Sequence, residues 1–335
     1  MKDFSEYRDG LLFLALAAVW GTAYPAIDVG LRALPPVTFA ALRYDLAGAL
    51  LLAYAAVAAL RRGDRWRPRG FREWRLVGVG GLLVVGLHFA LLFVGQGYVS
   101  GSIASVVMST TPVLMPLFAL VLLPDERLDR TGAVGIVLGL LGVAVVARPD
   151  PGGGGANAMG VVLLLLSAAS FALGSVLTER WDADLPLVPM QAWMMVVGAL
   201  ALHALAAGPV GESASLSAVT PATVAALVYL AVAASVGGLL AYFTLMRRVG
   251  PNEVSLVNYA VPMFAALGEW AALGGTVEGT TVAGFLVILA GFLAVKWDAL
   301  RRAATPTPDR PTPDSYSSGG GTVMVRGNVY YRDVE

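Results

Sequence analysis

Among the ionisable side chains inside apolar segments of the sequence, three are the best placed to do chemistry. Arg43 occurs in FAALRYDLAGALLL, His88 in VVGLHFALLF and Glu269 in MFAALGEWAAL. If such segments cross a bilayer, each charge costs about 2.5–3.5 kcal/mol on insertion scales and needs a partner or a function. Arg43 could hold a substrate carboxylate in its planar fork, or anchor a helix end. Glu269 could carry a coupling proton or pair with Arg43, and His88 could contact substrate or bond a neighbour as a neutral imidazole.

Polar residues also precede two prolines in similar contexts, STTP before Pro112 and NYAVP before Pro262. A proline inside a helix removes one backbone hydrogen bond and frees a carbonyl, which in lipid must be satisfied by protein or by cavity water. The two segments therefore predict paired polar breaks beside a cavity. The alternative is a simple kink, in which hydroxyl groups bond back to their own helix. The candidate site residues here are Ser109, Thr111, Asn258 and Tyr259.

Aromatic residues could supply the walls of a ligand site, with cation–π capacity for amines. The same rings could equally serve as packing or as part of an interfacial belt. The candidates, together with a neighbouring hydroxyl, are Trp20, Thr22, Tyr24 and Tyr242.

Other kinds of chemistry lack the residues that they require. The sequence has no cysteine and only two histidines, so we expect no cofactor and no metal site. Its net charge is zero, which argues against a nucleic-acid partner. It contains no Gly-x-Ser-x-Gly elbow, no phosphate-binding Gly-x-x-x-x-Gly-Lys-Ser/Thr and no Gly-x-Gly-Asp. We therefore expect no enzyme, although an intramembrane enzyme and a non-transporting sensor or scaffold remain alternatives.

The elements that must position these residues are transmembrane helices. Of 335 residues, 57% are hydrophobic and only 14% charged, more apolar than a water-soluble protein of this size can be. A membrane helix needs about 20 mostly apolar residues. The predicted spans lie at 10–31, 36–60, 75–95, 101–123, 131–147, 159–179, 188–208, 221–246, 251–274 and 280–298.

The cations set the orientation of these spans. With a cytoplasmic N-terminus, 20 of the 23 Lys and Arg residues fall on the cytoplasmic side, and only Arg32 and Arg148 fall outside. Arg43 lies within a span. Because cytoplasmic loops carry the excess of Lys and Arg, we predict a multi-pass protein of the cytoplasmic membrane with both termini inside.

The chain also contains an internal repeat. At an offset of 150, Ser105 matches Ser255 and Pro112 matches Pro262. Each half has five spans, an odd number, so the two copies must insert in opposite senses. We predict an all-α membrane protein with ten transmembrane helices as two inverted five-helix repeats.

The expected domains are the first repeat at 1–148, a flexible outer linker at 149–158, the second repeat at 159–300 and a disordered cytoplasmic tail at 301–335. Within that tail, Thr322–Glu335 is strand-like in composition.

Four segments carry a resemblance to a known family. They are WGTAYPAI at Trp20–Ile27, and the segments Leu34–Leu52, Gly97–Val146 and Pro251–Leu267. Together they resemble the EamA-type, ten-helix family of the drug/metabolite transporter superfamily. One departure is Asp28, which stands where the family commonly has lysine.

The resemblance implies transport by alternating access without ATP. It implies a central cavity lined by both halves, with helices 5 and 10 at the periphery. Substrates in the superfamily include amino acids, nucleosides, other metabolites and toxic compounds. We therefore predict a secondary active transporter that moves small organic solutes, in the export direction, across the cytoplasmic membrane. Its partners are the lipid bilayer, the substrate and a coupling proton or counter-substrate. Glycines within 131–147 could pack inside one chain or between two, which leaves a homodimer open.

Overall fold

The computed structural model describes most of the chain, and its gaps fall in loops, at the linker and in the tail. The described residues are 2–63, 65–122, 130–147, 156–181, 183–249, 254, 256–276, 278–295, 322–325 and 328–331. They fall into two compact units, Met1–Lys296 and Trp297–Glu335, and each is described by itself.

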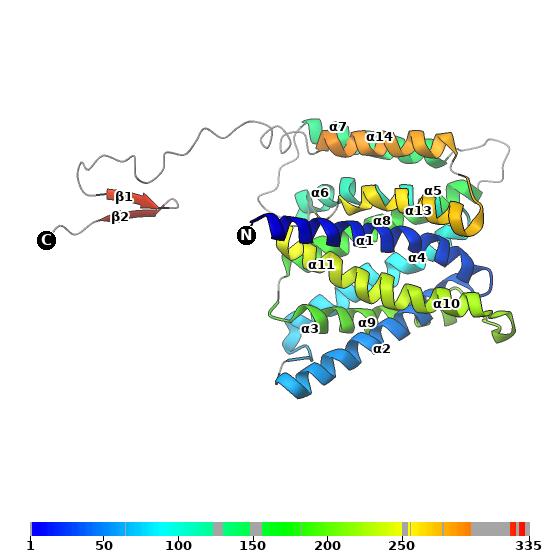
Figure 1. Cartoon of the computed structure of the whole chain (residues 1–335), viewed down its shortest axis with the longest axis horizontal. Helices are drawn as coiled ribbons and strands as arrows, with labels where there is room; N and C mark the ends of the chain where they lie inside the picture. The colour runs from blue at the N-terminus through cyan, green and yellow to red at the C-terminus, as the bar shows by residue number, and fades with distance from the viewer. Residues whose placement is uncertain are drawn as a thin grey trace. The chain divides into compact units, whose positions relative to one another are not determined.

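The first unit is a helical bundle in which every predicted span is occupied by helix (Figure 1). Seven spans are single helices, and three are composites of shorter elements. The single helices are α1 (Lys2–Leu31), α2 (Pro36–Arg62), α7 (Arg130–Ala147), α8 (Ala156–Arg180), α9 (Leu187–Ala207), α13 (Val257–Leu273) and α14 (Gly279–Val295).

The composite spans show the repeat in the backbone itself. The third span runs through α3 (Gly70–Gly80), the π-helical η1 (Gly81–Leu87) and α4 (His88–Gln96). The eighth runs through α10 (Pro221–Tyr229), the π-helical η3 (Leu230–Gly237) and α11 (Gly238–Val249), after the 3-10 turn η2 (Leu216–Ala218). The two π segments begin 149 residues apart and end 150 apart. The fourth span is α5 (Gly101–Met108) followed by α6 (Thr111–Leu122).

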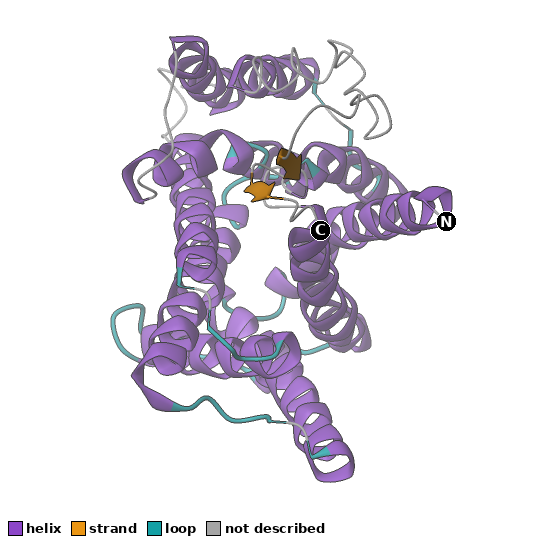
Figure 2. Ribbon diagram, turned by 90° about the vertical axis from the view of Figure 1, so that its left-hand side faces the viewer, coloured by secondary structure: helices purple, strands orange, loops and turns teal. Residues whose placement is uncertain are grey.

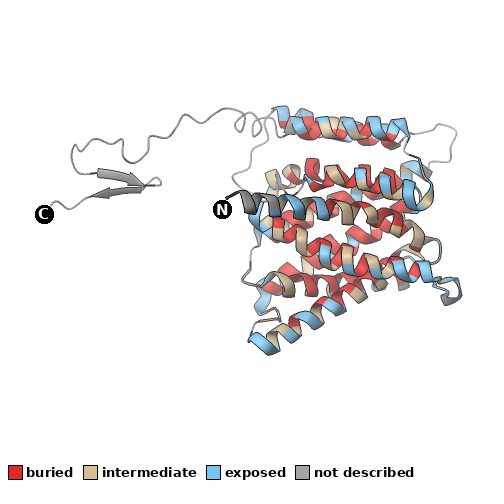
Figure 3. Cartoon of the chain, in the orientation of Figure 1, coloured by how far each residue is buried: buried red, intermediate tan, exposed pale blue. Residues whose placement is uncertain are grey.

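The helices are apolar outside as well as inside. Within the described part of the chain, seven are long and apolar enough to cross a membrane, and Thr131–Val146 and Gly279–Ala294 are shorter apolar helices. Their exposed faces carry large hydrophobic side chains such as Leu14, Val137 and Leu286 (Figure 3). A surface of this kind needs lipid as its solvent, so the chain is a multi-pass membrane protein.

The first helix of each repeat packs against helices of the other repeat. α1 packs on α13 and on α10–η3–α11, whereas α8 packs on α5–α6 and on η1–α4. Each group therefore joins the first helix of one repeat to the third and fourth spans of the other. We call α1, α10–η3–α11 and α13 the first bundle, and α8, α3–η1–α4 and α5–α6 the second bundle. α2 packs on α9 beside them.

α7 and α14 form a separate pair along one side of the bundle, at the top of Figures 1 and 2. Glycines let their backbones approach closely. A Cβ added at Gly142 would lie 2.8 Å from the Gly284 carbonyl oxygen, and one at Gly291 would lie 2.6 Å from that of Gly135. The glycines of the fifth span are thus used within one chain.

The second unit contains an antiparallel hairpin of β1 (Thr322–Val325) and β2 (Asn328–Tyr331). The tail predicted to be disordered thus includes two short strands where its composition is strand-like. The other residues of 301–335, and most of the linker 149–158, lie outside the described residues. α8 already begins at Ala156, inside the predicted linker.

Candidate functional site

A cavity lies midway along the bundle, where the two bundles and α2 meet. The centre of a water molecule can occupy about 60 Å³ of it, within about 600 Å³ of unfilled space that includes its mouth. Its walls come from α1, α2, α4 and α5 of the first repeat and from α8, η3, α11 and α13 of the second. Five residues singled out in the sequence line it: Trp20, Tyr24, Arg43, His88 and Asn258.

Arg43 is the charged group of this cavity. Its side chain comes from α2 and is 3% exposed. Nε donates to the Ser235 hydroxyl of η3 at 2.7 Å, and the guanidinium carbon lies 4.6 Å from the centre of the Phe89 ring. Nη1 has no hydrogen-bond acceptor among the described residues. A buried guanidinium nitrogen without an acceptor is a ready site for an anionic ligand oxygen.

His88 presents an acceptor to the same space. The Ser167 hydroxyl donates a hydrogen bond to the His88 carbonyl oxygen at 2.8 Å. The Ser167 carbonyl oxygen can only accept a hydrogen bond. The His88 Nδ1, which lies 2.8 Å from the Ser167 hydroxyl oxygen and 3.2 Å from its carbonyl oxygen, is therefore the protonated nitrogen. In the neutral ring Nε2 is then the acceptor. The expected bond to a neighbour and a role in the cavity are thus compatible.

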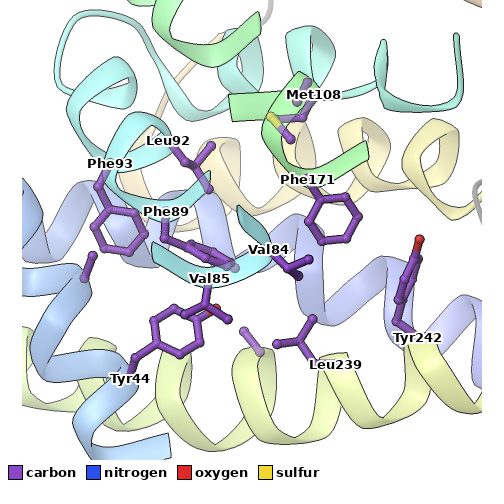
Figure 4. Packing of buried hydrophobic residues seen from close by; sticks show 14 of the residues in the cluster. Tyr44, Val84, Val85, Phe89, Leu92, Phe93, Met108, Phe171, Leu239 and Tyr242 are labelled. Carbon is purple, nitrogen blue, oxygen red and sulfur yellow. The ribbon is translucent and has the colours of Figure 1, made fainter. Parts of the chain in front are cut away.

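The aromatic walls are built by long-range contacts. The Trp20 indole nitrogen donates to the Ala234 carbonyl at 3.2 Å, and its ring lies 5.3 Å from that of Tyr242. Tyr242 thus backs Trp20 rather than lining the cavity itself. Phe89 and Phe171 face the cavity from α4 and α8, and Figure 4 shows them with Leu92 and Leu239.

The prolines free carbonyls as expected, and protein hydroxyls satisfy them. Pro262 cannot bond the Asn258 carbonyl, and that oxygen accepts from the Ser109 hydroxyl at 2.8 Å across the two bundles. Pro112 cannot bond the Met108 carbonyl, which accepts from Thr111 at 2.7 Å. The bond from Ser109 joins the two paired segments. The bond from Thr111 is the alternative, in which a hydroxyl group bonds back to its own helix. One expectation was wrong: α13 runs through Pro262 without a break, whereas the fourth span breaks at 109–110, just before Pro112.

Three candidates lie away from the cavity. Thr22 bonds the Tyr229 hydroxyl at 2.6 Å, and Tyr259 packs against Phe292 of α14 at 4.8 Å between ring centroids. Glu269 accepts from the backbone nitrogen of Ser102 at 2.8 Å. The expected pairing of Glu269 with Arg43 is therefore not seen in this structure.

No sequence pattern singles out Phe89, Phe171 or Ser235. Phe89 and Phe171 are ordinary apolar residues in apolar helices, so no pattern separates a cavity wall from packing. Ser235 is brought to Arg43 by the packing of α2 on η3, and this pairing has no local signature.

At the far end of the bundle, where α1 ends and α2 begins, polar contacts tie the two bundles together. Glu269 of α13 bonds the first turn of α5. The Gln96 amide of α4 donates to Asp28 at 2.6 Å and to the Tyr24 carbonyl at 2.8 Å. We call Asp28, Gln96, Ser102 and Glu269 the far-end cluster. Asp28, which stands where the family commonly has lysine, is thus partly buried in a contact between bundles.

The opposite end, where α1 begins, contains a wide recess. It holds about 1240 Å³, open solvent included, and its polar residues include Glu179, Asp184 and Arg247. Its walls come from α3, α8, α9, α11 and the segment between α8 and α9. Side-chain hydrogen bonds join the two bundles at the far end and midway, where Ser109 bonds the Asn258 carbonyl.

Comparison with known proteins places this architecture in context. The EamA-like transporter family matches residues 9–148 and 158–297, one match per repeat. A "Probable amino-acid metabolite efflux pump" of Salmonella typhimurium is 29% identical over 306 residues, covering 89% of this chain and 98% of that protein. The "Uncharacterized inner membrane transporter YedA" of Escherichia coli K12 is 33% identical over 287 residues, covering 79% and 86%.

A solved crystal structure shares the fold. It superposes with a TM-score of 0.62 at 21% sequence identity, covering 89% of this chain and 99% of the other. The helical, two-repeat architecture predicted from the sequence for the membrane part of the chain is thus confirmed.

Proposed function

Because the chain belongs to the EamA-like transporter family, we propose that it is a secondary transporter that moves small organic solutes across the cytoplasmic membrane through the central cavity. The observation that carries the proposal is the cavity itself. It lies midway between the two ends, both repeats line it, and a buried guanidinium nitrogen within it lacks an acceptor. A midplane site at the interface of inverted repeats is the arrangement of secondary transporters.

Transport proceeds by alternating access in this proposal. The two bundles rock about the cavity, which opens first to one end and then to the other. The far-end cluster holds the bundles together on one side, while the recess leaves room on the other. This arrangement corresponds to a state loaded from the end where α1 begins. Since the sequence lacks a phosphate-binding nucleotide motif, a proton gradient or a counter-substrate supplies the driving force.

The direction of net transport is export. The Salmonella relative is named as an efflux pump for amino-acid metabolites, and loading from the cytoplasmic side suits that direction. The cavity lies within a single chain, and glycines of α7 pack against α14 of the same chain. A single chain is therefore the transporting unit, and a homodimer is not required.

Filling the cavity should abolish transport without unfolding the protein. Ala23 lines the cavity from α1 and is 6% exposed. In Ala23→Phe, the ring occupies the space of the substrate, and we expect solute flux into proteoliposomes to fall by about tenfold or more. The control is Leu14→Phe on the same helix, where Leu14 is 53% exposed and faces lipid. Equal flux in both variants, or no flux of any solute class through the unmodified protein, would refute the transporter.

The orientation can be tested with single cysteines, because the sequence contains none. Ser213 lies exposed in the loop before α10 at the far end, and Arg62 lies exposed at the end of α2. We expect Ser213→Cys to react with an impermeant maleimide in intact cells, and Arg62→Cys to react only after permeabilisation. The reverse labelling pattern would place both termini outside.

A further inference from the structure

We propose that the transported solute is an organic monoanion, a carboxylate on an aryl or branched alkyl body that carries no ammonium group. The proposal rests on the proposed function and narrows it, since the amino acids among the superfamily's substrates carry an ammonium group. It follows from the charge of the cavity and from the positions of the nearby carboxylates.

The cavity presents one positive charge and no negative charge. Arg43 is the charged residue among its described lining, and neither Asp nor Glu contributes to that lining. The carboxylates of the far-end cluster are engaged elsewhere, Asp28 with Gln96 and Glu269 with the Ser102 nitrogen. A ligand that enters this space is removed from water, and an unpaired charge there is costly. A single carboxylate at Nη1 compensates the one charge that the protein buries.

Two contacts hold the Arg43 guanidinium so that its Nη1 stays available to a ligand. Nε is taken by Ser235, and the guanidinium lies over Phe89. These two contacts fix the plane of the fork and leave Nη1 without an acceptor. A planar carboxylate matches that geometry better than a point charge or a hydroxyl would.

An ammonium group finds no carboxylate among the described residues that line the cavity. The rings of Trp20 and Phe171 can offer it a cation–π contact but no compensating charge, and the ring of Phe89 already carries the guanidinium at 4.6 Å. The acceptor nitrogen of His88 is a neutral partner and can take a hydroxyl or an N–H, but it supplies no compensating charge. A second cation beside Arg43 would also be repelled.

Most of the remaining lining is apolar. Trp20, Phe171, Leu92 and Val261 surround it from four helices. Ring faces and branched alkyl groups suit an aromatic or branched body of the size that the cavity admits.

Three probes that share a phenylethyl body test the charge requirement. They are 3-phenylpropanoate, phenylalanine and 2-phenylethylamine, an anion, a zwitterion and a cation. Binding to the purified protein is measured by the shift in its melting temperature and by the quenching of its tryptophan fluorescence. We expect 3-phenylpropanoate to bind about tenfold more tightly than phenylalanine, and 2-phenylethylamine not to bind. Tighter binding of phenylalanine or of the amine would overturn the proposal, as would binding of none of the three.

Arg43 variants test whether this side chain recognises the charge of the solute. In Arg43→Gln the preference for the anion should disappear, and in Arg43→Lys it should persist with weaker binding because the fork is lost. Arg61→Gln, exposed at the end of α2, is the matched control and should keep the wild-type order. If Arg43→Gln does not fold, the order of the three probes on the unmodified protein still decides.

Flux measurements separate this proposal from the transporter itself. Binding of the anion without flux into proteoliposomes would leave the charge preference intact and refute transport. Flux of phenylalanine or of the amine in preference to the anion would leave transport intact and refute the substrate class.

Discussion

Replacing Glu269 with alanine is expected to open the far end of the central cavity. The carboxylate accepts the Ser102 backbone N–H in the first turn of α5 and thereby ties α13 to the second bundle. A hydrogen bond to a charged group contributes about 1.5–3 kcal/mol, and the positive end of the helix dipole adds to it. If this contact exists only while the far end is closed, its loss shifts the equilibrium toward the open form by about tenfold or more.

A cysteine inside the cavity reports the shift. Met108 lines the cavity from α5, so Met108→Cys in the cysteine-free chain provides one reactive thiol. We expect an impermeant thiosulfonate, added from the far end, to react about tenfold faster when Glu269→Ala is also present. Glu269→Gln, which keeps an acceptor oxygen, should fall between the two.

Glu212 provides a matched control. Its carboxylate caps α2 at the same end, with the Val37 nitrogen at 3.0 Å and the Thr38 nitrogen at 2.7 Å. It belongs to the segment after α9, which packs on α2, and it does not join the two bundles. Glu212→Ala should therefore leave the labelling rate at the wild-type value. A similar increase in both variants would mean that any lost cap loosens this end, and that Glu269 has no special part.

The second large effect is expected at Gly198, where α9 crosses η1. A Cβ placed there would lie 2.3 Å from Cγ1 of Val85 and 3.0 Å from the Gly81 carbonyl oxygen. Val85 is buried and cannot turn away. We expect Gly198→Ala to lower the free energy of unfolding by about 1–3 kcal/mol, as overpacking of a filled interior does.

The same exchange at Gly78 should have the opposite sign. Gly78 lies within α3, and a Cβ there would meet no atom within 4 Å. Alanine favours helix over glycine by about 0.8–1.0 kcal/mol, so Gly78→Ala should raise the stability slightly. Thermal unfolding in detergent, followed by tryptophan fluorescence, measures both variants. Equal melting temperatures would show that η1 and α9 are free to move apart.

The spans were predictable because lipid imposes a local rule. A helix that crosses a bilayer makes its backbone hydrogen bonds within itself. A run of about 20 apolar residues therefore predicts such a helix without any information about its neighbours. The pairing of the helices follows no such rule. α1 packs on α13 and α8 on α5–α6, and the exchange between repeats depends on side chains that lie far apart in the sequence. The π segments were equally hidden, since η1 and η3 are as apolar as the helices around them.

The candidate site was partly predictable for a related reason. Arg43 and His88 stood out because a polar group in an apolar span is costly, and both line the cavity. Glu269 stood out by the same argument, yet it caps a helix at the far end. Intramembrane charge thus indicates that a residue has a partner, but it does not say whether the partner is ligand or backbone. The long-range contact of Trp20 with Ala234 lay beyond any local pattern.

The glycine contacts between α7 and α14 have the form of an interface that matches itself. Gly135 and Gly142 recur 149 residues later as Gly284 and Gly291. Gly142 approaches Gly284, and Gly291, the copy of Gly142, approaches Gly135. Gly142 therefore meets the copy of Gly135, and Gly135 meets the copy of Gly142, which is the rule of an isologous two-fold dimer. A five-helix half-chain would carry on this helix a surface that can bind the same helix of a second half-chain inserted upside down. Fusing the halves through an odd number of helices fixes the two orientations at equal stoichiometry in every molecule.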